Sequence, residues 1–285
     1  MIVRKNMAEL EKMRAAGMLV WKILDTLRQM VKEGVTTLDL ENTAEKMMRE
    51  AGARPAFKGY STPTAATKFP FVLCTSVNHE IIHGMPSQKK VLRSGDIVSI
   101  DTGVQLNGYY GDSAITVGVG EVSGEVRRLM EVTRESLEMA IDKARPGNRL
   151  FDICGTVERH VTANGFSVVR EFVGHGIGTQ MHEEPQVPNY VDRRGENPRL
   201  KEGMVLAIEP MVNAGAAGVK VLEDGWTAVT EDRSLSAHFE HTVAVTSDGV
   251  AVLSFVGEPV SPERSGAGQW GPASGARSRG AGARG

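Results

Sequence analysis

Apolar residues recur at three- and four-residue steps near the start of the chain, from Leu10 through Val20 to Leu27. Residues with this spacing lie on one face of a helix, so the segment predicts an amphipathic helix. Thr37 is the predicted N-cap of a second helix, which runs to Glu50 and stops before a glycine.

The rest of the pattern mixes one more long helical stretch with strand-like segments. The helical stretch covers residues 125–144, and the strand-like segments, rich in β-branched and aromatic residues, cover 68–83, 96–119, 166–173, 204–222 and 239–256. We predict that these strands pair into one curved sheet with helices on its outer face, which is an α+β arrangement.

The chain also contains an internal repeat. Residues 145–153 match residues 32–40 in their Gly, apolar and Asp positions at an offset of 113, and residues 200–209 resemble residues 92–101 at an offset of 108. In the second pair, each segment is an apolar run that ends on a carboxylate. Two matches in the same order predict two similar halves around a pseudo-twofold axis.

Composition and charge exclude several classes of protein. The 285 residues, 41% of them apolar, can bury a large core, and the net charge of −2 indicates neither nucleic acid nor a membrane surface as a partner. No apolar run approaches the ~20 residues that span a bilayer, and the charged N-terminus argues against a secretory signal. We expect Cys74 and Cys154 to be buried thiols in a reducing compartment.

Two segments lack any periodic pattern. Residues 259–285 are rich in Gly, Ala, Ser and Arg, so we expect a disordered, solvated tail; contact with RNA or a ribosome is the alternative. Residues 61–68 have the composition of a mobile loop.

Two protease-like motifs do not fit their surroundings. His79-Glu80-Ile81-Ile82-His83 matches the zinc-protease pattern, which requires a helix, yet its flanks favour a strand and a turn. Asp101-Thr102-Gly103 resembles an aspartic-protease motif, which needs a second copy, and the later Ser247-Asp248-Gly249 has the wrong order.

A third arrangement draws on both halves of the chain. Asp101 ends a buried apolar run and Asp112 follows it across an Asn107-Gly108 hairpin turn, while Glu209 ends the corresponding run of the second half. Each carboxylate alone is more often a cap, turn or surface residue, but one at the end of a buried strand needs a partner. The candidate ligands are four carboxylates and one imidazole: Asp101, Asp112, His175, Glu209 and Glu240.

Such a concentration of negative charge needs cations. Two divalent ions roughly 3.5–4 Å apart would balance the carboxylates and bind a hydroxide between them. Ligands without sulfur suit Co, Mn, Fe(II) or Zn and do not choose among them.

These residues resemble the successive signatures of the type I methionine aminopeptidase family over about residues 7–257. The matching segments are Val77-Asn78, His83-Gly84, Ile100-Asp101, Gly111-Asp112-Ser113, Gly174-His175-Gly176-Ile177-Gly178, Met181-His182-Glu183-Glu184-Pro185, Ile208-Glu209-Pro210-Met211, Asp224-Gly225-Trp226 and Phe239-Glu240-His241-Thr242. The resemblance implies the pita-bread fold, with the internal symmetry that the repeat predicts independently. It also implies hydrolytic removal of the initiator methionine from nascent proteins, with a preference for a small second residue.

The resemblance assigns roles to individual residues. Asp101 and Asp112 would bind one metal ion, Asp112 and Glu240 would bridge to the second, and His175 and Glu209 would complete it. The hydroxide that bridges the two ions would attack the substrate carbonyl, with Glu209 as the proton acceptor.

Two histidines would contact the substrate by the same resemblance. His182 would hold the carbonyl oxygen as it becomes negative, and His83 would contact the scissile amide nitrogen. The methionine side chain needs an apolar pocket, for which Tyr60, Cys74 and Trp226 are candidates. Phe57 and Met181 are further candidates, and ordinary core packing is the alternative for the pocket residues. The segment between Gly59 and Cys74 is several residues longer than in the shortest members of the family, so the resemblance does not assign the residues of the pocket rim.

The resemblance further implies that residues 1–258 form a catalytic domain that is cytoplasmic, monomeric and in transient contact with the ribosome. Two alternatives remain. A proline-specific peptidase of the same fold usually carries an additional N-terminal domain, for which this chain has no room. A metal-free binding protein of the same fold would lack ligands, whereas all five are present here.

Overall fold

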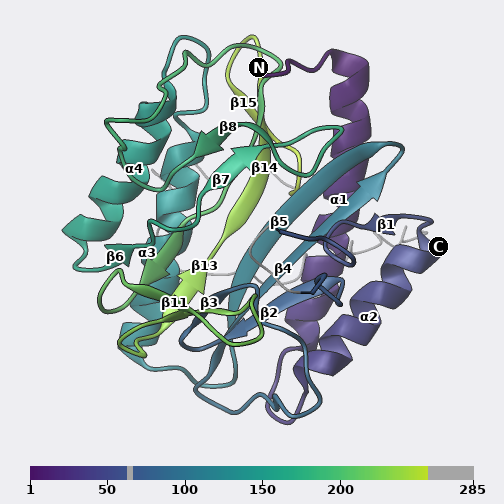
Figure 1. The fold of residues 1–285 in the computed structure, drawn as a ribbon, viewed down its shortest axis with the longest axis vertical. Helices are drawn as coiled ribbons and strands as arrows, with labels where there is room; N and C mark the ends of the chain where they lie inside the picture. Colours follow the sequence, from purple (N-terminus) through teal and green to yellow (C-terminus); the bar gives the residue numbers. More distant parts are fainter. Residues whose placement is uncertain (63–66, 256–285) are drawn as a thin grey trace, which may run out of the picture.

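The computed structural model describes residues 1–62 and 67–255, which form four helices and fifteen strands (Figure 1). The helices are α1 (Met7–Met30), α2 (Thr37–Glu50), α3 (Gly124–Ile141) and α4 (Leu150–Ala163). The strands are β1 (Arg54–Pro55), β2 (Leu73–Val77), β3 (Glu80–Ile82), β4 (Ile97–Leu106), β5 (Tyr109–Gly118), β6 (Ser167–Val168), β7 (Gly174–Gly176), β8 (Glu183–Val187), β9 (Val205–Ile208), β10 (Met211–Asn213), β11 (Val219–Val221), β12 (Ala228–Thr230), β13 (Ser236–His238), β14 (Glu240–Val245) and β15 (Val250–Val252).

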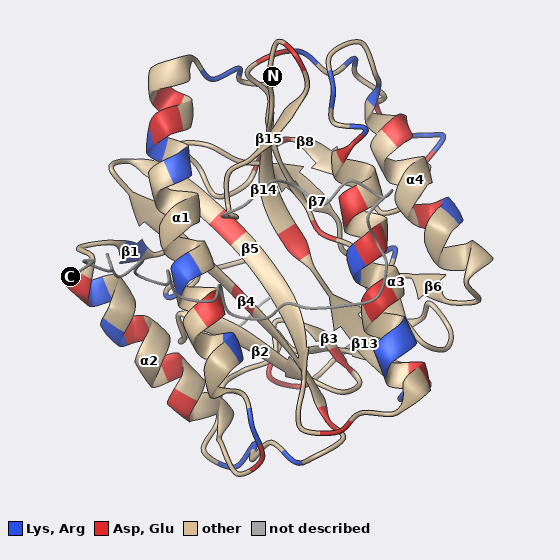
Figure 2. Cartoon of the chain, turned by 180° about the vertical axis from the view of Figure 1, so that it is seen from behind, with Lys and Arg blue, Asp and Glu red and all other residues tan. Residues whose placement is uncertain are grey.

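A nine-stranded sheet forms the centre of this described part. Its strand order is β1-β4-β5-β14-β9-β7-β8, with β2 paired to β4 and β15 paired to β14, and its pairings are antiparallel. The helices lie in two pairs, α1 with α2 and α3 with α4, on the same face of the sheet (Figures 1 and 2). The predicted α+β class with a curved antiparallel sheet is therefore confirmed.

The predicted helices are present, with shifted ends. Thr36, and not Thr37, is the N-cap of α2: its hydroxyl accepts from Asp39 N–H at 3.1 Å, and its own N–H donates to the Asp39 carboxylate at 2.9 Å. Thr37 is buried and its hydroxyl donates to the Ser87 carbonyl. Two adjacent threonines are equal as N-caps by propensity, so the tertiary contact decides between them.

The internal repeat is visible in the hydrogen bonding. Helices α2 and α4 have 14 residues each. Their preceding residues form matching isolated bridges, Thr36 with Val91 and Arg149 with Arg199. The bridged residues differ by the same two offsets, 113 and 108, that the sequence shows. The two halves are therefore built alike at their helix starts.

The prediction of a single sheet was wrong. Two further three-stranded sheets, β13-β10-β6 and β11-β12-β3, contain segments that we expected in the main one. The change occurs at Glu209 and Pro210, between β9 in the main sheet and β10 in a small one. Proline has no N–H to donate to a ladder, so the strand cannot continue through it. Phe239 marks the matching break between β13 and β14, and its N–H donates to the Pro210 carbonyl at 3.3 Å.

Other expectations have mixed outcomes. Cys74 and Cys154 are buried free thiols, as predicted. The expected strand 166–173 is reduced to β6, and within the described residues no helix has the length and apolarity needed to cross a membrane. The expected tail at 259–285 and residues 63–66 of the expected loop lie outside the described residues.

Candidate metal centre

The β4–β5 hairpin brings Asp101 and Asp112 to one face of the sheet. Asn107 and Gly108 form its turn with φ values of 53° and 82°, the left-handed conformation that a two-residue hairpin loop requires. Gly103 is the cross-strand partner of Asp112 and lies two residues after Asp101, so both carboxylates point the same way. A Cβ on Gly103 would lie 3.1 Å from Asp112 Oδ1, so the glycine leaves room for this carboxylate.

The second half adds Glu240 and Glu209 to the same face. Ala114 pairs with Asp101 on one side and with Glu240 on the other, so the three residues form a row across β4, β5 and β14. Because Ala114 is small, it leaves the space between the two carboxylates open. Glu209 follows the last residue of β9, at the break before Pro210.

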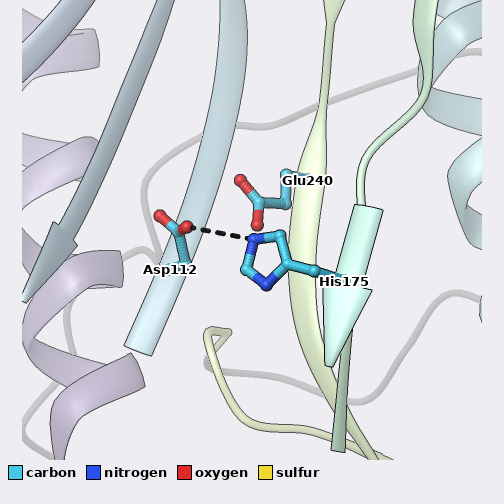
Figure 3. A group of neighbouring side chains, drawn as sticks. All are labelled: Asp112, His175 and Glu240. Carbon is cyan, nitrogen blue, oxygen red and sulfur yellow. Dashed lines mark ion pairs between the residues drawn. The ribbon is translucent and has the colours of Figure 1, made fainter. Parts of the chain in front are cut away.

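His175 enters the group from β7, which pairs with β9. Its Nδ1–H donates to the Gly176 carbonyl oxygen at 2.8 Å, which leaves the lone pair on Nε2. Nε2 lies 3.6 Å from Glu209 Oε1 and 4.0 Å from Asp112 Oδ2. Ligand atoms of Asp112, His175 and Glu240 all lie within 4.8 Å of one another (Figure 3).

The electrostatics of this group require a cation. Burial raises the pKa of Asp112 to about 7. Burial and the charge of Asp112 raise the pKa values of Asp101, Glu209 and Glu240. Burial lowers the pKa of His175 to about 3, so its imidazole is neutral. The shifts of the four carboxylates disfavour the charged forms that a metal ion would stabilise, and the neutral imidazole is the form in which His175 can bind a metal ion.

The hydrogen bonds lead to the same conclusion. Asp101 Oδ1, Asp112 Oδ1 and Glu240 Oε1 are buried without a hydrogen-bond partner in the described structure. None of the ion pairs seen in residues 1–62 and 67–255 joins these carboxylates to Lys or Arg. Acidic positions on β5 and β14 lie side by side in the middle of the sheet (Figure 2). Orphaned carboxylate oxygens around one neutral imidazole fit divalent metal ions.

Two more histidines, His182 and His83, were expected to contact the substrate. The His182 ring is 4.3 Å from the His175 ring, centroid to centroid, and its Nδ1 is 2.8 Å from the Tyr60 hydroxyl. His83 follows β3 with a φ of 58°, and burial lowers its pKa to about 4. His182, which we expected near the substrate, is thus close to the candidate centre, and the His83 ring lies 6.3 Å from the Trp226 ring, centroid to centroid.

Comparison with known proteins decides the family. The model of metallopeptidase family M24 matches residues 11–247. The chain is 49% identical over 254 residues to methionine aminopeptidase of Clostridium acetobutylicum, which covers 89% of this chain and 99% of that protein. The crystal structure of methionine aminopeptidase from Thermotoga maritima superposes with a TM-score of 0.85 at 44% identity, over 89% of this chain and 99% of that one. The chain is a methionine aminopeptidase of family M24.

Proline-specific peptidases share the fold and less of the sequence. Prolidase from Pyrococcus furiosus superposes with a TM-score of 0.71 at 24% identity, and the match covers 90% of this chain but only 66% of the prolidase. This likeness shows the pita-bread fold alone. The family assignment also makes the chain a metallo-exopeptidase that uses divalent metal ions.

The aminopeptidase has an apolar cluster beside the carboxylates. Cys74 pairs with Asp101 across β2 and β4, so its thiol adjoins the candidate centre. Phe69, Cys74 and Trp226 are buried together, and Phe57 and Tyr60 pack against them. Sequence reasoning had not included Phe69, although it lies only five residues before Cys74.

Met181, by contrast, does not join this cluster. It packs with Leu10, Met13 and Ile177 in a separate one, although both clusters touch Phe57. Its neighbour His182 faces the site, and in an irregular segment such as this turn no periodicity predicts which side chain turns inward.

Glu80 of the first motif and Asp248 of the second are structural in this aminopeptidase, whereas His83 and Asp101 of the same motifs are candidate site residues. Glu80 belongs to strand β3, accepts from Val77 N–H at 2.9 Å and pairs with Lys90 at 2.6 Å. Asp248 is exposed in the turn between β14 and β15. Neither side chain is part of the carboxylate group.

Proposed function

We propose that five residues hold a dinuclear metal centre through which this enzyme removes N-terminal methionine from nascent proteins. They are Asp101, Asp112, His175, Glu209 and Glu240. The observation that supports this ligand set is the row of buried carboxylates with orphaned oxygens, closed by one imidazole whose Nε2 lone pair faces them. When bound, two divalent ions would activate a water molecule and polarise the substrate carbonyl.

The side chains around the centre supply proton transfer and orientation. Glu209 is the proton acceptor: its Oε1 lies 3.6 Å from His175 Nε2, among the residues that would hold the metal ions, where it can take up a proton from the attacking water. His182 donates to the carbonyl oxygen of the scissile bond. Its Nδ1 contacts the Tyr60 hydroxyl, and when that hydroxyl donates, the ring proton resides on Nε2 and is available to the substrate. His83 contacts the scissile amide nitrogen.

We propose that the cluster of Phe69, Cys74 and Trp226, rimmed by Tyr60 and Phe57, accepts the methionine side chain. A thioether is apolar and polarisable, and it packs well against aromatic rings. Burial raises the pKa of the Cys74 thiol, so this wall of the cluster stays uncharged. A metal ion held beside this cluster would bind the substrate α-amine, which would restrict cleavage to the first residue, and we propose a preference for a small second residue.

Residues 1–258 form the catalytic domain in this proposal. The enzyme acts in the cytoplasm as a monomer and contacts the ribosome transiently, because its substrates are chains that have just emerged from synthesis.

Metal depletion tests the proposal. Metal-free protein supplied with Mn, Co or Fe(II) is assayed on Met-Ala-Ser and on an Ala-Pro peptide. We expect release of methionine only, and only after a divalent metal is added. Full activity in the metal-free protein, or cleavage of the Ala-Pro peptide, would contradict it.

A further inference from the structure

His238 lies beside the carboxylate group, and its side chain makes no hydrogen bond in the described structure. It ends β13, its exposed fraction is 2%, and neither Nδ1 nor Nε2 makes a hydrogen bond. A neutral imidazole has one N–H donor and one acceptor nitrogen, and buried polar groups are rarely left unpaired. The ring therefore needs a partner that it meets in the working enzyme.

Backbone hydrogen bonds fix the position of His238. His238 N–H donates to the Thr116 hydroxyl at 2.8 Å, and that hydroxyl donates to the His238 carbonyl at 2.7 Å. His238 also pairs with Met211 across β13 and β10, and Met211 lies two residues after Glu209. The pairing that follows the break at Pro210 thus brings His238 alongside Glu209.

Glu209 stands between two imidazoles that are not equivalent. His238 Nε2 is 3.9 Å from Glu209 Oε2, and His175 Nε2 is 3.6 Å from Glu209 Oε1. The only N–H of the neutral His175 ring, on Nδ1, donates to the Gly176 carbonyl oxygen, so His175 cannot donate a hydrogen bond to Glu209. Of the two, only His238 can donate, and its gap to Oε2 is about 1 Å longer than a hydrogen bond.

A neutral donor suits this place. A Lys or Arg would neutralise Glu209 and compete with a divalent ion for it, whereas the N–H of a neutral imidazole donates a hydrogen bond without adding a charge. A hydrogen bond from it fixes the orientation of the carboxylate and leaves its negative charge for the metal.

We propose that His238 is a positioning residue: Nε2–H donates to Glu209 Oε2 and holds Oε1 toward His175 and the metal centre. The inference rests on the proposed function, because it assigns Glu209 to that centre. His238 acts through Glu209 and touches neither metal nor substrate.

Three variants of the full chain test the inference. His238→Leu removes the donor, His238→Gln keeps an N–H donor of similar reach, and His160→Gln is the control, because His160 lies on α4 and contacts Glu135. Each protein is loaded with Co(II); its visible absorption spectrum, metal affinity by calorimetry, kcat and KM are measured, and the metal-free form is melted.

We expect His238→Leu to shift the Co(II) bands, to weaken the weaker metal-binding event by about 10- to 100-fold and to lower kcat with KM changed less than twofold. His238→Gln should restore most of each value. The metal-free Leu variant should melt no lower than wild type, because it loses an unpaired polar group. If His238→Leu does not fold, His238→Asn takes its place. The shorter Asn side chain holds its N–H donor further from Glu209, so this variant should show the same losses.

A folded His238→Leu protein with the wild-type Co(II) spectrum and metal affinity would overturn the inference and leave the aminopeptidase function intact. A His238→Gln protein with losses as large as those of His238→Leu would do the same. If wild-type protein bound Co(II) and released no methionine, the proposed function would fail instead. The spectral and affinity readouts, which do not depend on turnover, would still decide the role of His238.

Discussion

Replacing Asp112 by Asn should stabilise the metal-free protein while it abolishes catalysis. Burial raises the pKa of Asp112 from 3.8 to about 7. A carboxyl with a higher pKa in the folded chain destabilises the fold when ionised. This cost is absent below pH 3.8, grows as the pH rises to about 7 and is constant above that value.

The size of the effect follows from this interval. At 1.36 kcal/mol per tenfold change in the ionisation equilibrium, the interval corresponds to about 4 kcal/mol. The neighbouring carboxylates share the repulsion, and the new amide must itself be buried, so we expect a net gain of roughly 2 kcal/mol at pH 8. For a chain of this size that gain raises Tm by about 4–8 °C. At pH 5 the gain should be less than half as large.

Calorimetry at pH 5 and pH 8 measures this gain in stability. The melting of three metal-free proteins is compared: wild type, Asp112→Asn and the exposed control Asp248→Asn. The buried histidines are common to all three proteins, so their titration cancels in the differences. Saturating Mn or Co should reverse the order, because the bound metal stabilises wild type and the variant loses a bridging ligand. Activity should fall by roughly 100-fold or more. A metal-free variant that melts below wild type at pH 8 would refute the argument that these carboxylates repel one another.

Three further changes test other contacts. Lys5→Met should lower the free energy of unfolding by roughly 3–5 kcal/mol in denaturant, because it leaves the charge of Glu183 unpaired at a site where the two side chains are 3% and 9% exposed. Adding Glu183→Gln should recover part of this loss, and a cost of Lys5→Met below about 1 kcal/mol would contradict the reasoning. Tyr60→Phe keeps the ring but removes the hydroxyl 2.8 Å from His182 Nδ1, so kcat should fall about tenfold with little change in Tm; an unchanged kcat would separate Tyr60 from catalysis. Gly174→Ala places a Cβ 2.4 Å from a backbone carbonyl oxygen of β9, so the free energy of unfolding should drop by roughly 1–3 kcal/mol and metal affinity should fall. A variant that melts at the same temperature as wild type would show that β7 can shift to make room for the methyl group.

Patterns that depend on neighbouring residues could be predicted from the sequence. The Asn107-Gly108 turn fixes the hairpin because both positions need positive φ, and strand alternation then brings Asp101 and Asp112 to one face. Helix α2 follows from its threonine N-cap and from the glycine after its end. The repeat offsets also survive in the paired bridges, because similar local sequences formed similar helix starts.

Features that depend on distant segments were decided by tertiary structure. Propensity could not choose between Thr36 and Thr37 as an N-cap; the contact of Thr37 with Ser87 did. Phe69 joins the apolar cluster through tertiary packing, which the periodicity of the sequence does not predict.

His238 shows the limit most clearly. It lies two residues before Glu240, the spacing that puts side chains on one side of an extended segment, so alternation alone could have drawn attention to it. Its place beside Glu209 depends on the break at Pro210 and on the pairing of β10 with β13. Local sequence sets backbone preferences over a few residues. Only the folded sheets determine which buried groups meet, because pairings such as β10 with β13 join segments that are distant in the chain.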